Sequence, residues 1–416
     1  MLLRSFQEGG QITMMSTKKE WKRSVRRQHE DATRWADVLF SLHGAGLMWR
    51  LERVRNWFIN LVAGMAAVAG VSAAEFPQSA FKEPVGLEVP AAEYPSVLGG
   101  VTEAREWPAR REEIFQAWRK ELGPWPTLLK APEVRVASQI AKRGYTERKV
   151  EVQVAKEQFT PGYLLTPEGT GKFPAVLVVF YDPETSAGLS TNKLRDFGLQ
   201  LAKRGFVTLS IGSPGGDARK PQLGDAVTQP LSYLAYAAAN AQTALARRPE
   251  VDPKRIGIVG HSYGGKWALF AAALDDRFAA AAFSDPGIVF DETRPNVNYW
   301  EPWYLGFEPG KTRKQGVITA TDGRTGAYKR LVESGRDLHE LMALIAPRPF
   351  LVSGGSEDPP ERWHALRRVN EVYHLLGATN KVAMTNRPGH DPTTESNEQI
   401  YAFFEKFLKE GAALQP

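Results

Sequence analysis

The sequence predicts an α/β fold with a mostly parallel central sheet and helices on both faces. The continuous apolar run at 173–180 is typical of a strand that is buried on both faces, and 205–211 and 255–260 are expected to be further buried strands. Segments with helical periodicity alternate with these runs along the chain. Such alternation gives right-handed crossovers and a parallel sheet, whose ligands bind beyond the carboxyl ends of the strands.

The other expected elements continue this alternation. Residues 149–154 alternate polar side chains with valine, as a half-exposed strand does, and 163–165 reads as its partner. Further strands are expected at 279–283, 349–353 and 381–385, and helices at 110–122, 192–204, 230–247, 263–274, 336–345, 361–376 and 394–410.

Length and composition indicate one large catalytic domain with additions. The chain has 416 residues, of which 43% are hydrophobic and 24% charged, as in proteins that bury an ordinary core. We expect the catalytic domain at 145–412. Residues 75–144 are interpreted as an N-terminal helical arm, whose helix ends at the Gly-Pro pair 123–124.

The net charge of +6 is concentrated near the N-terminus. Residues 1–74 hold 11 Lys or Arg and 6 acidic residues, which leaves 42 basic and 41 acidic residues over 75–416. Proteins that bind nucleic acid carry a clustered basic surface. The balanced charge of the larger part therefore predicts no nucleic-acid partner.

Residues 48–74 have the layout of a secretory signal peptide. Arginines precede an apolar run at 57–71, and a small-residue cleavage pattern follows at 72–74. The run has 15 residues, fewer than the ~20 that cross a bilayer. We expect a periplasmic or secreted protein with no membrane contact after cleavage, the alternative being an uncleaved anchor. Residues 1–47 are interpreted as an upstream extension from a start assigned too early.

The chain contains no cysteine. This excludes disulfides, thiolate-bound zinc or iron–sulfur sites and a cysteine nucleophile. The sequence also lacks a metal-ligand cluster and a phosphate-cradling glycine loop, so we expect no metal and no cofactor.

The segment 260–264 fits the pattern Gly-x-Ser-x-Gly, with Ser262 at its centre. It follows a predicted buried strand and opens a predicted helix, which is the context of a nucleophile elbow. The sharp turn would make side chains at 260 and 264 clash, and glycine at both positions removes the clash. The pattern predicts Ser262 as a nucleophile; the alternative is a glycine-rich turn with an idle serine.

A serine nucleophile needs a base and a carboxylate that orients it. His390 follows the last predicted strand in a loop at the carboxyl edge of the sheet, and is the expected base. Asp358, in the loop after the strand at 349–353, is the favoured acid. Glu357 in the same loop and Asp285, directly after the strand at 279–283, stay open as alternatives.

The oxyanion of an acyl-transfer reaction needs two hydrogen-bond donors. We expect one to be the backbone amide of Tyr263, which follows the nucleophile. The second is expected from the loop after the strand at 173–180, where Tyr181 is the favoured residue.

An aromatic-rich insertion is expected at about 288–324. Trp300, Trp303 and Tyr304 are predicted to form a stacking surface for a sugar or aryl group beside the active site. The alternative is a cap whose aromatic side chains bury one another.

Together these motifs resemble those of the α/β-hydrolase superfamily over roughly 145–410. The acetyl xylan esterases, dienelactone hydrolases and prolyl-oligopeptidase-type catalytic domains are the most similar groups. The resemblance implies the α/β-hydrolase fold, with Ser262, Asp358 and His390 as nucleophile, acid and base. The segment 264–266 also resembles the serine turn of glucuronoyl esterases, but the arginine that they carry after the serine is Tyr263 here. The resemblance rests on the motifs PEVDPKRIGIVGHSYGG (249–265), PRPF (347–350) and GH (389–390).

The predicted function is a secreted serine carboxylic-ester hydrolase that acts through an acyl-enzyme on a small-molecule or carbohydrate ester, with an acylated carbohydrate as the favoured substrate. A prolyl-oligopeptidase-type peptidase is one alternative, although residues 75–144 are too few for the propeller of those enzymes. A catalytically inactive fold that serves as a binding module is the other. The oligomeric state does not follow from the sequence.

Overall fold

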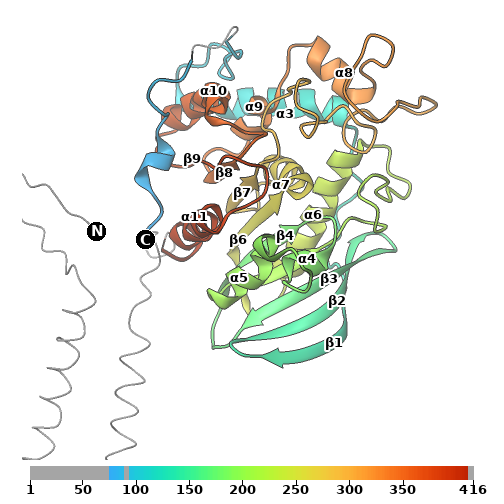
Figure 1. Ribbon diagram of the computed structural model, residues 1–416, viewed down its shortest axis with the longest axis vertical. Helices are drawn as coiled ribbons and strands as arrows, with labels where there is room; N and C mark the ends of the chain where they lie inside the picture. Colours follow the sequence, from blue (N-terminus) through green and yellow to red (C-terminus); the bar gives the residue numbers. More distant parts are fainter. Residues whose placement is uncertain (1–74, 89–92, 411–416) are drawn as a thin grey trace, which may run out of the picture. The chain divides into compact units, whose positions relative to one another are not determined.

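A nine-stranded sheet forms the centre of the computed structural model, which describes residues 75–88 and 93–410 (Figure 1). Its strand order is β1-β2-β3-β5-β4-β6-β7-β8-β9. The six strands from β5 to β9 in this order are parallel, and β1, β2 and β3 join them through antiparallel pairings. The strands are β1 (Val134–Lys142), β2 (Tyr145–Ala155), β3 (Gln158–Pro167), β4 (Phe173–Val179), β5 (Val207–Ile211), β6 (Val251–His261), β7 (Ala280–Ser284), β8 (Phe350–Gly354) and β9 (Val382–Asn386).

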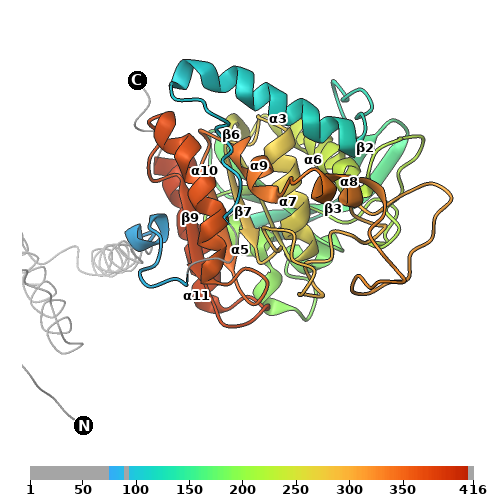
Figure 2. The same ribbon diagram turned by 90° about the horizontal axis from the view of Figure 1, so that it is seen from above.

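Helices cover both faces of this sheet (Figure 2). Side chains of α3, α6, α7, α9 and α10 pack in the larger apolar core on one face, and those of α5 and α11 pack in a second core on the other. The helices are α3 (Trp107–Leu122), α4 (Pro183–Ser186), α5 (Phe197–Lys203), α6 (Pro230–Ala246), α7 (Tyr263–Leu274), α8 (Gly326–Glu333), α9 (Leu338–Ala343), α10 (Trp363–Leu375) and α11 (Thr394–Phe404).

The predicted α/β architecture is confirmed, because the strands expected from apolar runs form the parallel part of the sheet. All five residues of β5, β7 and β8 are buried, as strands covered on both faces should be. The expected helix at 192–204 is shorter, since a 3₁₀ turn precedes α5.

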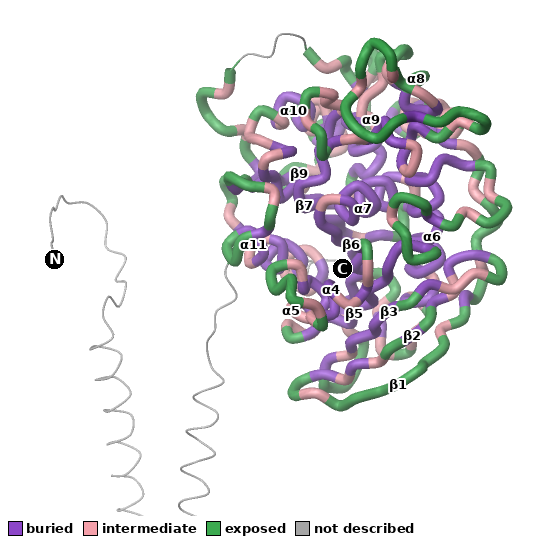
Figure 3. Tube along the Cα trace, turned by 45° about the vertical axis from the view of Figure 1, so that its right-hand side comes forward, coloured by how far each residue is buried: buried purple, intermediate pink, exposed green. Residues whose placement is uncertain are grey.

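Strand β1 and helix α8 were not among the expected elements. Strand β1 lies at the edge of the sheet, and seven of its nine residues are exposed (Figure 3). Neither face of β1 is buried, so its sequence lacks the apolar alternation by which half-buried strands are identified.

The predicted N-terminal arm contributes to the main core. The side chains of Trp107, Ile114, Trp118 and Leu122 on α3 are buried in the larger apolar cluster. Strand β1 also belongs to the predicted arm, and the expected domain start at 145 falls in the β1–β2 hairpin. The described residues of 75–144 therefore belong to the same compact unit as the sheet.

Two other sequence expectations bear on the fold. The insertion at 288–324 contains neither a helix nor a strand.

The predicted signal peptide at 48–74 and the upstream extension at 1–47 lie outside the described residues. Over 75–88 and 93–410, no helix is long and apolar enough to cross a membrane.

Candidate active site

Ser262 stands at the sharp turn between β6 and α7. Its backbone has φ 54° and ψ −112°, a conformation that non-glycine residues rarely adopt. A Cβ atom on Gly260 would lie 2.2 Å from the carbonyl oxygen of Gly264, and one on Gly264 would lie 2.0 Å from that of Val179. The two glycines of the motif are therefore required for this turn.

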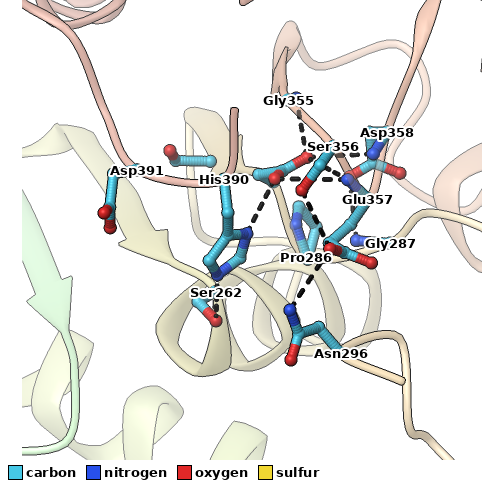
Figure 4. A network of polar contacts seen from close by, with 12 residues as sticks. Ser262, Pro286, Gly287, Asn296, Gly355, Ser356, Glu357, Asp358, His390 and Asp391 are labelled. Carbon is cyan, nitrogen blue, oxygen red and sulfur yellow. Dashed lines mark hydrogen bonds and ion pairs between the residues drawn. The ribbon is translucent and has the colours of Figure 1, made fainter. Parts of the chain in front are cut away.

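His390 bridges Ser262 and a buried carboxylate (Figure 4). Its Nε2 atom lies 2.9 Å from Oγ of Ser262, and its Nδ1 atom lies 2.8 Å from Oδ2 of Asp285. The imidazole is 25% exposed, whereas the side chain of Asp285 is fully buried. The three side chains thus form a continuous hydrogen-bonded series from a partly accessible hydroxyl to a desolvated carboxylate.

The prediction of Asp358 as the carboxylate beside the histidine is corrected by this geometry, since Asp285 occupies that place. The carboxylate of Asp358 accepts hydrogen bonds from the amides of Gly287 (2.8 Å) and Ile288 (2.6 Å). Its own amide donates to Oδ1 of Asp285 (2.9 Å). The turn after β8 directs the backbone of Asp358, and not its side chain, toward the histidine site.

Glu357 lies close to these groups without a hydrogen bond to His390. Its Oε1 atom accepts from Oγ of Ser356 (2.9 Å) and from the side-chain Nδ2 of Asn296 (3.3 Å). Asp285, Glu357 and His390 place potential metal-ligand atoms within 4.8 Å of one another. The hydrogen bond between Asp285 and His390 already uses two of those atoms, so the cluster is accounted for as an acid–base arrangement.

Arg387 fixes the loop that carries His390, and the sequence analysis did not single it out. Its buried guanidinium donates to the carbonyl oxygens of His390 (2.6 Å), Asp391 (2.8 Å) and Ser353 (2.8 Å). Burial lowers its pKa, but arginine remains charged in proteins. The only sequence signal was a charged residue three positions before the histidine.

His261, inside the Gly-x-Ser-x-Gly motif, is packed beside His390. The two ring centroids are 4.8 Å apart, and Nδ1 of His261 lies 3.1 Å from Oγ of Ser284. Burial lowers the pKa of His261 well below its ordinary value. A neutral imidazole is therefore expected next to the residue that contacts Ser262.

The two expected oxyanion donors are the backbone amides of Tyr263, which begins α7 directly after Ser262, and of Tyr181. Within the described part of the chain, the backbone amides of Tyr181 and Tyr263 donate to no protein group. The two tyrosine rings stack with centroids 4.7 Å apart. Burial of its hydroxyl raises the pKa of Tyr181, and the neighbouring Ser262 side chain opposes that rise. Two free amides and one phenol are thus available close to the serine.

The aromatic residues of the insertion separate into two groups. Trp300 is 0% exposed and Tyr304 is 4% exposed, so the prediction that these two rings form a stacking surface is wrong in this structure. They pack against other rings of the core. Trp303 is only partly buried, and the guanidinium of Arg219 lies 5.8 Å from its ring centroid. Of the three, Trp303 alone can offer a face to a ligand.

Comparison with known proteins agrees with this geometry. Residues 160–294, which include Ser262 and Asp285, match the model of the dienelactone hydrolase family. The carbohydrate esterase MZ0003, from an unknown prokaryotic organism, is 26% identical over 192 residues, which are 39% of this chain and 41% of that protein. The chain spans about half the length of the first curated relatives that it matches.

The solved structure of a glucuronoyl esterase from Solibacter usitatus is similar in fold. The TM-score is 0.61 at 20% sequence identity, over 77% of this chain and 99% of the other.

The putative hydrolase YtaP of Bacillus subtilis is 32% identical over 274 residues. The match covers 60% of this chain and 83% of the relative. With the nine-stranded sheet and the serine at its strand-to-helix turn, this similarity shows that the chain belongs to the α/β-hydrolase superfamily, in the same family as that hydrolase.

Proposed function

We propose that the protein is a serine carboxylic-ester hydrolase that acts through an acyl-enzyme. The observation that carries this proposal is the series of short contacts from Ser262 through His390 to Asp285. A serine hydroxyl becomes an effective nucleophile when a base accepts its proton and a carboxylate fixes the tautomer of that base.

The geometry supports a two-step reaction. Nε2 of His390 accepts the proton of Ser262, and Oγ attacks the ester carbonyl. Asp285 stabilises the imidazolium, which then returns the proton to the departing alcohol. Water next attacks the acyl-enzyme with His390 again as base, and the carboxylic acid is released.

The groups around the serine support stabilisation of the oxyanion. The amides of Tyr263 and Tyr181 are free to donate in the described structure. Helix α7 begins directly after Ser262, and the positive end of its dipole favours negative charge at that place. The phenol of Tyr181, whose pKa is influenced by the neighbouring Ser262, is proposed as a third donor.

An acylated carbohydrate is the substrate class that we favour. Carbohydrate esterases and glucuronoyl esterases are among the relatives and fold neighbours by name. Trp303 supplies a partly exposed indole on the insertion, and sugar rings stack on such faces. Tyr263 stands where glucuronoyl esterases carry arginine, so the oxyanion contacts of this chain are proposed to come from amides and a phenol.

We also propose that the protein is exported from the cytoplasm after cleavage of a signal peptide. The composition of residues 48–74 supports a signal peptide. N-terminal sequencing of protein recovered from the periplasm or medium tests this, and a mature chain that begins before residue 48 would contradict it.

Hydrolysis of p-nitrophenyl acetate, an aminoacyl p-nitroanilide, acetylated xylo-oligosaccharides and methyl glucuronate tests the activity. We expect ester cleavage that falls ~10⁴-fold or more in Ser262→Ala, because the three side chains act as a unit. Cleavage of the anilide alone would favour a peptidase. No turnover of any substrate would favour a binding module.

A further inference from the structure

The loops that follow β7 and β8 hold each other through two buried aspartates. Asp285, at the start of one loop, is buried and accepts hydrogen bonds from three backbone amides of the other. These amides belong to Gly355 (2.6 Å to Oδ1), Glu357 (3.2 Å to Oδ1) and Asp358 (2.9 Å to Oδ1).

Asp358, in the loop after β8, accepts hydrogen bonds from the loop after β7 in the same way. Its two carboxylate oxygens accept from the amides of Gly287 and Ile288, at 2.8 and 2.6 Å. The side chain of Asp358 is fully buried, as is that of Asp285. Each aspartate therefore fixes the backbone on which the other is carried.

Lys266 supplies a third connection from helix α7. Its Nζ atom donates to the carbonyl oxygen of Pro286 (2.7 Å) and to that of Asn296 (2.9 Å). The side chain is 1% exposed. Since Lys266 lies one helical turn after Ser262, it links the helix of the nucleophile to the residue next to Asp285.

The backbone needs these connections because its conformation at Asp285 is unfavourable. Asp285 has φ +50° and Gly287 has φ +79°, both in the left-handed region. An aspartate in that region is strained and keeps its conformation only where the surroundings determine it. Loss of a connection would let the segment 285–288 relax and turn the carboxylate away from His390.

Charged groups face this loop from several elements. Asp285, Glu357 and Asp358 lie around Lys266, and Arg362 acts on Asp358 from the start of α10. Burial raises the pKa of Asp358 to about 6, with a further rise from Asp285, and burial lowers the pKa of Lys266 to about 8. At a pH between these two pKa values, both side chains are largely charged. A charged carboxylate is the stronger acceptor and a charged ammonium the stronger donor for the hydrogen bonds that each makes.

We propose that Asp358 and Lys266 are positioning residues, which act on the reaction only by holding the segment 285–288 so that Asp285 faces His390. This inference rests on the proposed esterase function. It gives Asp358 a role that differs from the acid predicted by the sequence, because its carboxylate serves backbone amides and does not contact the imidazole.

The test compares Asp358→Asn and Lys266→Met with the matched control Asp337→Asn. Asp337 also accepts from backbone amides, those of Phe290 (2.8 Å) and Leu338 (2.6 Å), but in the described part of the chain no hydrogen bond joins it to the segment 285–288. We expect kcat for p-nitrophenyl acetate to fall about 10- to 100-fold in the first two variants, with KM little changed. Asp337→Asn should stay within about twofold.

A double-variant cycle separates positioning from a general loss of structure. If Asp358 acts through Asp285, Asp358→Asn should have little further effect on kcat in the Asp285→Asn background. The inference is overturned if folded Asp358→Asn keeps the kcat of the wild type, or if the two losses multiply. Should Asp358→Asn fail to fold, Lys266→Met carries the same cycle.

The Nδ1 proton of His390 gives a readout that does not depend on turnover. Its hydrogen bond to Asp285 should give a downfield proton resonance in the wild type, which Asp358→Asn and Lys266→Met shift or abolish and Asp337→Asn preserves. An unchanged resonance in the first two variants would overturn the inference. An inactive wild-type protein that shows the resonance changes would instead overturn the proposed function alone.

Discussion

Oδ2 of Asp285 lies 2.8 Å from Nδ1 of His390, although 105 positions separate the two residues in the chain. The amide of Ser262 donates to the carbonyl oxygen of Ser284 (2.8 Å), so Asp285 directly follows the residue whose backbone pairs with Ser262. Asp285 and Ser262 thus directly follow the neighbouring strands β7 and β6, and His390 comes from the loop after β9. This arrangement makes the identity of the acid testable.

Replacement of Asp285 by asparagine should lower kcat about 10³- to 10⁴-fold without unfolding the protein. The amide cannot hold the tautomer of His390 or stabilise its charged form. Steady-state hydrolysis of p-nitrophenyl acetate measures the loss. Glu357→Gln is the matched control, and a larger loss in that variant than in Asp285→Asn would identify Glu357 as the acid.

Gly264→Ala should prevent the nucleophile turn from forming. The added methyl group would lie 2.0 Å from the carbonyl oxygen of Val179, far inside van der Waals contact, and neither backbone segment can yield. We expect a large fall in melting temperature or no folded protein. Gly323→Ala is the control, because its methyl group meets nothing within 4 Å; equal melting temperatures for the two variants would contradict the prediction.

The stability of the protein should depend on Asp337 between about pH 4 and pH 7. Burial raises the pKa of Asp337 from 3.8 to about 7. The folded state therefore holds this proton more tightly than the unfolded state, so the free energy of unfolding falls as the pH rises through this window. Each unit of difference in pKa corresponds to about 1.4 kcal/mol.

Denaturant unfolding at several pH values measures this dependence. Asp337→Asn cannot titrate, so its free energy of unfolding should fall less steeply with rising pH than that of the wild type. Parallel curves for the two proteins would show that Asp337 ionises normally in the folded state.

Trp300 and Trp303 should respond differently to replacement by alanine. Trp300 is fully buried and its indole donates to the carbonyl oxygen of Gly316 (2.8 Å), so its loss should cost about 3–5 kcal/mol of stability. Trp303 is partly exposed, and its loss should raise KM for a carbohydrate ester more than for p-nitrophenyl acetate. Melting temperature and KM for both esters measure the two effects, and an unchanged KM ratio in Trp303→Ala would remove that residue from the proposed binding surface.

The sequence predicted the parallel sheet and the positions of Ser262 and His390 well, because the signals there are local. Buried strands appear as apolar runs, and a nucleophile turn requires glycine at 260 and 264 for steric reasons that the motif displays. The place of His390 after the last strand likewise follows from chain order. The edge strand β1 was missed because it buries neither face.

The choice among carboxylates could not be made in the same way. Ser284 and Ser353 pair in register at the ends of β7 and β8, so Asp285 and Asp358 both begin near the same edge of the sheet. Which carboxylate turns toward the histidine depends on a left-handed backbone conformation at Asp285, and nothing in the residue pattern specifies it. The inward packing of Trp300 and Tyr304 similarly depends on contacts between distant segments.

Helix α3 has a practical consequence for anyone who recombines or shortens this protein. The indole of Trp118 donates to Glu340 (2.8 Å) beside the ring of Phe270, and the ring of Phe76 packs against Phe403 with centroids 5.6 Å apart. A clone that started at the hairpin near residue 145 would lack these aromatic side chains and would expose the apolar surfaces that they cover to water. Gene fragments for expression or chimera building should therefore retain the stretch from Phe76 onward.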